Sequence, residues 1–162
     1  MRKIFLIFAL LFSISCSSEN EGQLVIEAEW MVKARQLLVG VWNGELVSPV
    51  TGLTECEDIV FTPFDTPKEQ VSIFGEFIAY GVAELEHYFD DHLLQTEKRC
   101  LFTILDYDTT EGLLIAFYPC NDKNEVTGRE DKRILFAESS TKFYMRKYGL
   151  TKENNFTYTK QN

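Results

Sequence analysis

The feature that most constrains this chain is a long alternation of apolar and polar residues near its middle. Across residues 71–89, almost every second residue is apolar or small, while Glu84 and Glu86 fall on the other parity. A period of two is typical of strands that bury one face. The stretch is too long for one straight strand in a small domain, because each residue adds about 3.3 Å. We therefore expect Gly75 and Gly81 to bend or turn the chain.

The same pattern recurs on both sides of this stretch. Strands are predicted at residues 41–47, 58–62, 99–107, 112–120, 133–137, 142–148 and 155–158. Residues 108–111 join two of them as a hairpin, and the polar stretch 121–132 is expected to be a loop. Residues 23–38 hold strong helix formers with an apolar stripe and no Gly or Pro, which predicts one helix. The chain is therefore predicted to be all-β, with one helix before about eight strands.

The N-terminal segment has the pattern of an export signal. Arg2 and Lys3 precede a short apolar run at residues 4–12, and small residues then lead into Cys16. The run is too short to cross a bilayer of about 30 Å, so it indicates a processing signal. It resembles the signal peptide of bacterial lipoproteins, which implies cleavage before Cys16, a lipid on that residue and an address at the outer membrane. An ordinary secretory peptide with an incidental cysteine is the alternative.

These assignments divide the chain into three parts. Residues 1–15 are the expected signal peptide, residues 16–22 a polar tether, and residues 23–162 a single domain of sufficient length to bury a core. The full chain carries a formal net charge of −9. Such an acidic chain is not expected to bind nucleic acid or anionic lipid headgroups.

A short motif at the start of the first strand suggests a family. Gly40 and Trp42 form a Gly-x-Trp after the helix, and this order resembles the lipocalin-like lipoproteins of the bacterial envelope. The resemblance implies a small antiparallel up-and-down barrel, with an arginine late in its last strand lying across the tryptophan. Arg146 fits that position, so Trp42 and Arg146 are interpreted as a structural pair. Tyr144 and Tyr148 share its parity, and an anion clamp is the alternative.

Two functions remain open for such a barrel. An eight-stranded barrel can hold one small ligand or fill with side chains. The first hypothesis is a binding protein with a cavity for a small apolar ligand, lined by Phe77, Leu85, His87, Ile104 and Phe117. The second is a protein-interaction or inhibitor lipoprotein with a filled barrel. No catalytic motif is present in the sequence, so neither an enzyme nor a cofactor is expected.

The densest group of potential metal ligands lies in residues 84–92, the sequence ELEHYFDDH. The alternation places His87 on the face opposite Glu84 and Glu86, so these side chains do not converge. The sequence Asp90-Asp91-His92 is typical of a solvated turn. No metal site is therefore predicted.

Three cysteines remain if Cys16 is lipidated, so at most one internal disulfide can form. With the hairpin centred near Thr110, facing residues have numbers that add up to about 220, which places Cys100 opposite Cys120. Directly opposite Cα atoms can lie about 4.5 Å apart, which permits a disulfide. A register change of one residue would turn the side chains to opposite faces. Cys100–Cys120 is the predicted bridge, with Cys56 as the competing partner.

Overall fold

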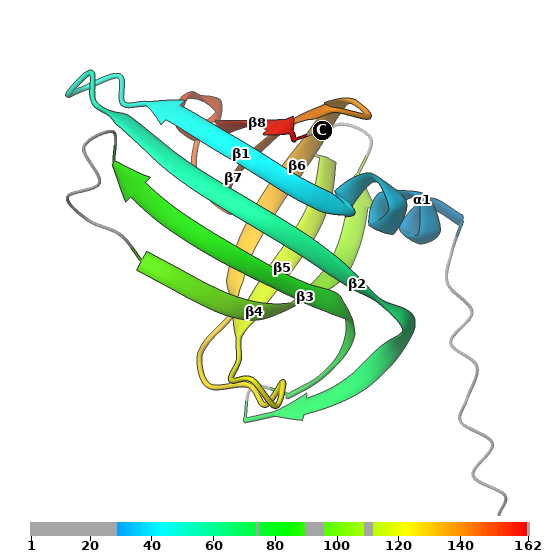
Figure 1. Cartoon of the computed structure of the whole chain (residues 1–162). Helices are drawn as coiled ribbons and strands as arrows, with labels where there is room; N and C mark the ends of the chain where they lie inside the picture. Colours follow the sequence, from blue (N-terminus) through cyan, green and yellow to red (C-terminus); the bar gives the residue numbers. More distant parts are fainter. Residues whose placement is uncertain (1–28, 74, 90–95, 109–111, 162) are drawn as a thin grey trace, which may run out of the picture.

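The computed structural model describes residues 29–73, 75–89, 96–108 and 112–161, in which one helix precedes a closed antiparallel barrel (Figure 1). The elements are α1 (Glu29–Leu38), β1 (Gly40–Val47), β2 (Thr54–Ser72), β3 (Gly75–Phe89), β4 (Thr96–Asp108), β5 (Gly112–Pro119), β6 (Asp131–Ser139), β7 (Lys142–Lys147), the short 3-10 helix η1 (Lys152–Asn154) and β8 (Phe156–Lys160). The strands follow chain order around the barrel, and β1 closes on β8. The predicted up-and-down barrel is confirmed. The predicted signal peptide, the tether and Cys16 lie outside the described residues.

Strand β2 is much longer than the sequence predicts. Its expected end lay before Pro63, yet the strand continues to Ser72. Proline lacks the N–H that a ladder needs, and the pairing of β2 with β3 accordingly shifts between Pro63 and Lys68. The two strands meet at a turn that ends at Gly75, whose φ of 120° favours glycine. No helix in the described part of the chain is long and apolar enough to cross a membrane.

Strand β3 changes its inward parity at Gly81. Tyr80 and Ala83 both belong to the central core, although strict alternation would place them on opposite faces. A Cβ atom on Gly81 would lie 2.4 Å from the Thr62 carbonyl oxygen and 2.6 Å from the Pro63 Cα atom. Glycine therefore lets β2 and β3 approach closely where the strand bends.

This change of parity makes the prediction for Phe77 wrong. Phe77 was expected to line an internal cavity. It lies instead on the outer side of the barrel, where its ring stacks on Tyr118 with centroids 4.0 Å apart. It packs there against a second apolar cluster that includes Ala79 and Leu101. The long β2–β3 hairpin thus covers part of the outer face of β4 and β5.

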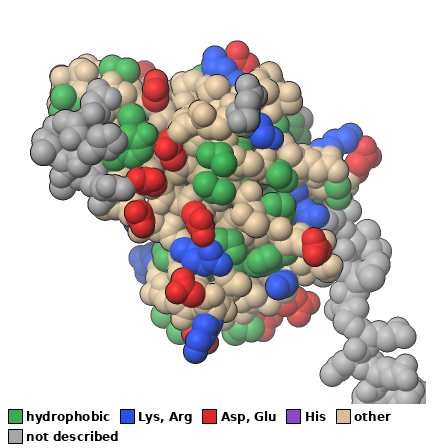
Figure 2. Space-filling view, viewed as in Figure 1, with side chains coloured by type: hydrophobic (Ala, Val, Ile, Leu, Met, Phe, Trp, Pro, Cys, Tyr) green, Lys and Arg blue, Asp and Glu red, His purple; other side chains and the backbone are tan. Residues whose placement is uncertain are grey.

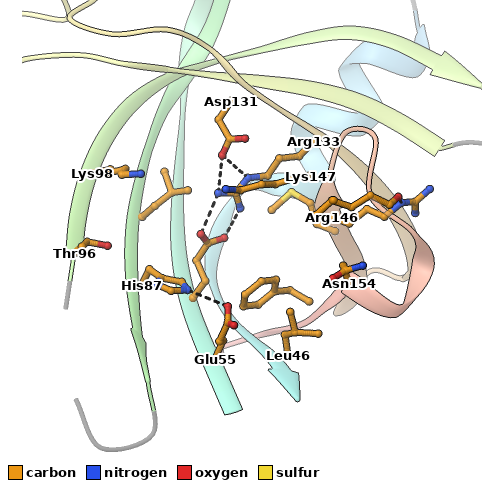
Figure 3. A pocket seen from close by; sticks show the side chains of 15 residues that line it. Leu46, Glu55, His87, Thr96, Lys98, Asp131, Arg133, Arg146, Lys147 and Asn154 are labelled. Atoms are coloured by element: carbon orange, nitrogen blue, oxygen red, sulfur yellow. Dashed lines mark hydrogen bonds and ion pairs between the residues drawn. The ribbon is translucent and has the colours of Figure 1, made fainter. Parts of the chain in front are cut away.

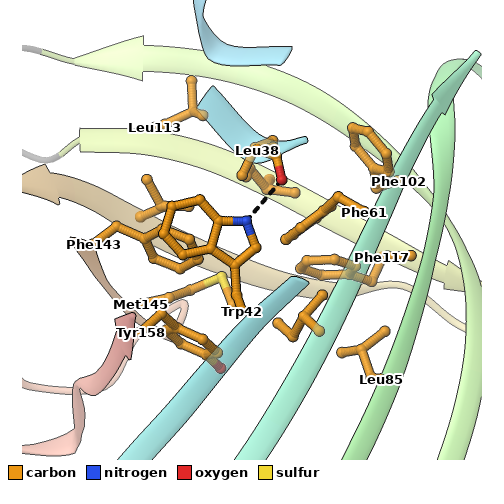
Figure 4. Packing of buried hydrophobic residues seen from close by; sticks show 14 of the residues in the cluster. Leu38, Trp42, Phe61, Leu85, Phe102, Leu113, Phe117, Phe143, Met145 and Tyr158 are labelled. Carbon is orange, nitrogen blue, oxygen red and sulfur yellow. Dashed lines mark hydrogen bonds between the residues drawn. The ribbon is translucent and has the colours of Figure 1, made fainter. Parts of the chain in front are cut away.

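The core fills the half of the barrel next to α1 (Figure 4). Its largest fully buried side chains are Trp42, Tyr158, Phe102, Phe117, Phe143, Leu38, Ile59, Ile115, Leu135 and Met145. The Trp42 indole donates a hydrogen bond from Nε1 to the Leu38 carbonyl oxygen at 2.8 Å. This bond ties the first strand to the end of the helix.

Helix α1 covers this end of the barrel. The ladder between β3 and β4 runs only from the Gly81–Phe102 pair to the His87–Thr96 pair. Beyond it, α1 contacts both strands. The Tyr80 hydroxyl lies 3.4 Å from Met31 Sδ, and the Trp30 ring stacks on Tyr107 with centroids 5.9 Å apart. The apolar face of α1 thereby closes the barrel where these two strands separate.

The predicted pairing of Trp42 with Arg146 is wrong. The cation beside the indole is Lys160 in the last strand, whose Nζ lies 5.3 Å from the ring centroid. Met145 packs in the core, so Arg146 points outward, because neighbouring side chains in a strand face opposite sides. Its Nε donates to the Leu150 carbonyl oxygen at 2.9 Å, and its guanidinium lies 6.0 Å from the Phe136 ring centroid.

The predicted disulfide is also wrong. Near the turn, β4 and β5 pair in the expected register, as in Asp106–Leu114. A bulge at Leu105 then shifts the ladder by one residue, so Cys100 faces Pro119 instead of Cys120. Cys100 consequently belongs to the inner core and Cys120 to the outer cluster. Both are free thiols, as is Cys56.

Candidate functional site

The barrel is hollow at the end opposite α1, where a pocket of about 370 Å³ lies between the strand ends. Figure 3 shows this pocket and the side chains around it. This open-end pocket is lined by the last residues of β1, β3 and β7 and the first residues of β2, β4, β6 and β8. The residues that border it are Leu46, Glu55, Glu57, Leu85, His87, Thr96, Lys98, Asp131, Arg133, Met145, Arg146, Lys147, Leu150, Asn154 and Phe156. Charged and apolar groups therefore share one cavity.

A buried ion pair forms the inner wall of the open-end pocket. Glu57 and Arg133 are only 6% and 8% exposed, and the two carboxylate oxygens of Glu57 each accept from a terminal nitrogen of the guanidinium. The fully buried Tyr158 donates its hydroxyl to Glu57 Oε1 at 2.5 Å. Asp131 Oδ2 accepts from Arg133 Nε at 3.0 Å, and the guanidinium lies 5.2 Å from the Phe117 ring centroid. The polar atoms of this group satisfy one another.

The ionisation of these groups follows from their mutual contacts. Burial alone would raise the pKa of Glu57, but Arg133 and the Tyr158 hydroxyl outweigh it and hold that pKa below its usual value. Burial likewise opposes the charge on Arg133, while Glu57 raises the pKa of the guanidinium. Burial and the Glu57 charge raise the pKa of Tyr158 well above its usual value. At neutral pH, Glu57 and Arg133 are therefore charged and Tyr158 is a neutral donor.

Gly44 makes room for this arrangement. It pairs with Glu57 on β2 and with Tyr158 on β8. A Cβ atom at this position would lie 2.4 Å from Cε1 of the Tyr158 ring. The absence of a side chain at Gly44 therefore lets the Tyr158 ring lie across β1 and reach the carboxylate.

His87 lies at the mouth of the pocket, with Nε2 3.6 Å from Glu55 Oε2. The structure places Glu84 on the other face, where its carboxylate accepts from Arg99 at 2.8 Å, in agreement with the predicted alternation. Within the described residues, no three His, Cys, Asp or Glu side chains gather closely enough to hold a metal ion. Asp90, Asp91 and His92 lie outside these residues.

The structure separates the five residues predicted to line one cavity. Leu85 and His87 line the open-end pocket. Phe117 is buried beneath Arg133 and borders a smaller neighbouring pocket of about 260 Å³. Ile104 is part of the packed core, and Phe77 lies outside the barrel. The cavity is therefore shorter and more polar than the sequence predicts.

Sequence reasoning missed the charged residues of this pocket. Glu57 lies two positions before the inward-facing Ile59, and Arg133 lies two positions before Leu135. Their parity was thus a usable signal, because alternate residues of a strand share a face. The predicted strands instead begin at Asp58 and Arg133, which leaves Glu57 outside its strand and Arg133 at the start of the other.

No family model, no curated protein and no solved structure matches this chain. The strand order and register of the barrel are compatible with a lipocalin-like fold.

Proposed function

We propose that this protein is a bacterial envelope lipoprotein, held at the outer membrane by a lipid on Cys16, whose barrel binds a small molecule in the open-end pocket. The observation that carries the proposal is the pocket itself. Its volume of about 370 Å³ falls in the range of about 300–1,000 Å³ that is usual for small-molecule sites. It lies at the mouth of a small barrel, where such sites commonly occur.

The lining indicates an amphiphilic ligand instead of a wholly apolar one. Leu46, Leu85, Met145, Leu150 and Phe156 supply apolar surface on the walls. The carboxylates and cations of the same pocket require a ligand with a polar part, because burying charged groups against apolar atoms is costly. The ion pair at the inner wall is satisfied without a ligand, so it supports a preformed site.

A filled barrel that serves protein interaction is the second candidate. It is favoured by the complete packing of the half next to α1. It is also favoured by exposed apolar side chains in and around the β1–β2 turn, where Val47, Val50 and Leu53 are 62%, 90% and 60% exposed. On the face seen in Figure 2, however, acidic and basic side chains are interspersed without a large patch of one sign. That face gives no support to a uniformly acidic docking surface.

The pocket can be tested by blocking its mouth. Thr96 is exposed and lines the pocket, whereas its neighbour Glu97 is exposed and points outward. In full chains carrying Cys16→Ala, we expect Thr96→Trp to abolish binding of a single-chain amphiphile such as dodecanol in calorimetric titrations, and Glu97→Trp to leave it unchanged. Equal binding by both variants would mean that the ligand does not enter the open-end pocket. Absence of binding to the parent chain would contradict the proposed function.

A further inference from the structure

The ion pair of Glu57 and Arg133 crosses the interior of the barrel. Glu57 lies on β2 and Arg133 on β6, and three strands separate β2 from β6 in either direction around the closed barrel. Glu57 shares its inward parity with Ile59, and Arg133 shares its own with Leu135. The two hydrogen bonds between them therefore join opposite sides of the barrel. We call this contact the spanning ion pair.

The spanning ion pair limits the depth of the open-end pocket. The Phe117 ring lies 5.2 Å from the Arg133 guanidinium, and the ring of Tyr158, which binds Glu57, stacks on Phe143 with centroids 4.7 Å apart. Both phenylalanines are fully buried in the core, so a ligand is confined to the pocket of about 370 Å³. This volume lies near the lower end of the usual range of about 300–1,000 Å³, which favours a compact ring over a long chain.

Hydrogen-bond acceptors remain on the pocket side of this pair. Glu57 is 6% exposed, and its lowered pKa keeps it ionised at neutral pH. Within the described residues, its Oε1 accepts from Arg133 and Tyr158, whereas its Oε2 accepts from Arg133 alone. Asp131 binds the same guanidinium through Oδ2 only. Since each carboxylate oxygen can accept two hydrogen bonds, Glu57 and Asp131 can both accept from the hydroxyl groups of a ligand.

The charges that face the pocket balance one another. Its carboxylates are matched by cations, with Glu55, Glu57 and Asp131 against Lys98, Arg133 and Lys147. An ionised ligand would bring an uncompensated charge beside a buried pair whose own charges cancel, and burying such a charge is costly. The charge balance therefore favours an uncharged ligand.

Apolar side chains border the same pocket from four strands. They are Leu46 on β1, Leu85 on β3, Met145 on β7 and Phe156 on β8. A pyranose ring carries C–H groups on its faces and hydroxyl groups around its edge. Its faces can bury apolar area against these side chains, while its hydroxyl groups donate to carboxylates. The lining thus offers the two kinds of surface that such a ring requires.

We propose that the spanning ion pair determines the specificity of the open-end pocket, which takes a compact, uncharged ring with several hydroxyl groups, such as a pyranoside. The hydroxyl groups of this ligand point toward Glu57 and Asp131. The inference rests on the proposed function and adds the chemical class of the ligand. It also gives the buried charges a role beyond stability, since a buried ion pair adds little to the free energy of unfolding.

The test compares rings of one size that carry different polar groups. The probes are the methyl pyranosides of glucose, galactose and mannose, methyl glucuronide with an added carboxylate, and cyclohexanol with a single hydroxyl group. Each is titrated calorimetrically into full chains carrying Cys16→Ala. We expect at least one methyl pyranoside to bind about tenfold or more tightly than cyclohexanol, a difference of about 1.4 kcal/mol. Methyl glucuronide should bind no more tightly than methyl glucoside.

The first variant replaces the buried polar group as a unit, by Glu57→Met, Arg133→Met and Tyr158→Phe. It is expected to fold, because exchange of a whole buried ion pair for apolar side chains is often neutral or stabilising. The matched control, Glu84→Met with Arg99→Met, removes an ion pair on the outer face. The triple variant should lose the preference for the pyranoside and still bind cyclohexanol, whereas the control should keep the preference.

A second variant keeps the spanning ion pair intact. Asp131→Asn changes a carboxylate of the pocket into an amide. Glu130→Gln makes the same change at a neighbour that pairs with Lys132 and is not among the described residues that border the pocket. Because a hydrogen bond to a charged acceptor is about twice as strong as one to a neutral acceptor, Asp131→Asn should weaken pyranoside binding about fivefold. Glu130→Gln should leave it unchanged.

Several outcomes would overturn the inference. They are equal affinity of the parent chain for pyranosides and cyclohexanol, a preference that survives the triple substitution, unchanged pyranoside binding by Asp131→Asn, and tighter binding of methyl glucuronide than of methyl glucoside. The Asp131→Asn comparison decides the question even if the triple variant does not fold. In each of these cases, dodecanol binding that Thr96→Trp blocks would still support the pocket. Binding of neither dodecanol nor any ring would contradict the proposed function as well.

Discussion

Glu57 and Arg133 place two opposite charges at the inner wall of the open-end pocket, where both side chains are buried. Each side chain loses hydration energy on folding. The bidentate contact between Arg133 and Glu57, together with the hydrogen bond from the Tyr158 hydroxyl, offsets this loss. A buried pair of this kind adds little net stability, but the loss of one partner leaves an uncompensated charge. Together with Tyr158, the two residues thereby fix the mutual positions of β2, β6 and β8 at the inner end of the pocket.

The first prediction removes the negative member of this pair. Glu57→Gln should lower the free energy of unfolding by about 3–5 kcal/mol, because Arg133 then stays buried without its counter-charge. Glu84→Gln is the matched control, since Glu84 pairs with Arg99 on the exposed face, and it should cost about 1 kcal/mol or less. Urea unfolding followed by far-ultraviolet circular dichroism measures both. Similar losses of stability in the two variants would contradict the account, because they would mean that an unpaired Arg133 costs no more in the barrel than an unpaired Arg99 on the surface.

The second prediction concerns pH. Because the folded protein holds the pKa of Glu57 below its usual value, the ionised carboxylate stabilises the folded state. This contribution is fully present above the unfolded pKa of about 4.3 and is lost as the pH falls through the lower folded pKa. The urea midpoint of the parent chain should therefore drop more steeply below about pH 5 than that of Glu57→Gln. Parallel pH profiles of the two proteins would be inconsistent with this assignment.

At the scale of the elements, local alternation predicts where strands lie but not where their parity changes. The hairpin of β4 and β5 and the turn at Gly75 follow from the pattern and the turn residues. The bulge at Leu105 leaves no mark in the sequence, because neither Leu105 nor its neighbours Ile104 and Asp106 is a glycine or a proline. The parity change at Gly81 depends on the approach of Thr62 and Pro63 from another strand. The inward positions of Leu85 and His87 were predicted correctly, because the strand keeps a regular alternation after this bend.

The third prediction tests the bend. Gly81→Ala should destabilise the protein by about 1–3 kcal/mol, because the added Cβ would meet the backbone of Thr62 and Pro63. Gly128→Ala is the control, since its Cβ would come no closer than 3.3 Å to the Pro119 ring and would meet no backbone atom, so it should cost much less. Thermal unfolding of the two variants compares them under one condition. A neutral Gly81→Ala would mean that β2 and β3 lie further apart at this point.

At the scale of the whole molecule, the barrel has one packed end and one hollow end. Helix α1, Trp42 and the aromatic core close the first end, while charged strand ends surround the second. This division explains why a sequence rich in inward apolar residues has a short and polar pocket. Most of the barrel interior stabilises the fold and leaves only the open end for a ligand.

The fourth prediction addresses the proposed anchor. Cys16→Ala should release the protein from the membrane fraction of the cell, because the lipid would have no attachment site. Cys56→Ala changes a buried thiol of the barrel and should leave the protein in that fraction. Immunoblots of fractionated cells distinguish the two. Membrane association of the Cys16→Ala chain would count against a lipid at this residue.

The most direct test of the central proposal is native mass spectrometry of the protein purified from bacterial envelopes. The parent chain and Glu97→Trp should each carry a small-molecule adduct, and Thr96→Trp, whose new side chain blocks the open-end pocket, should carry none. A ligand-free mass for all three proteins, or the same adduct on all three, would contradict a ligand site in this pocket.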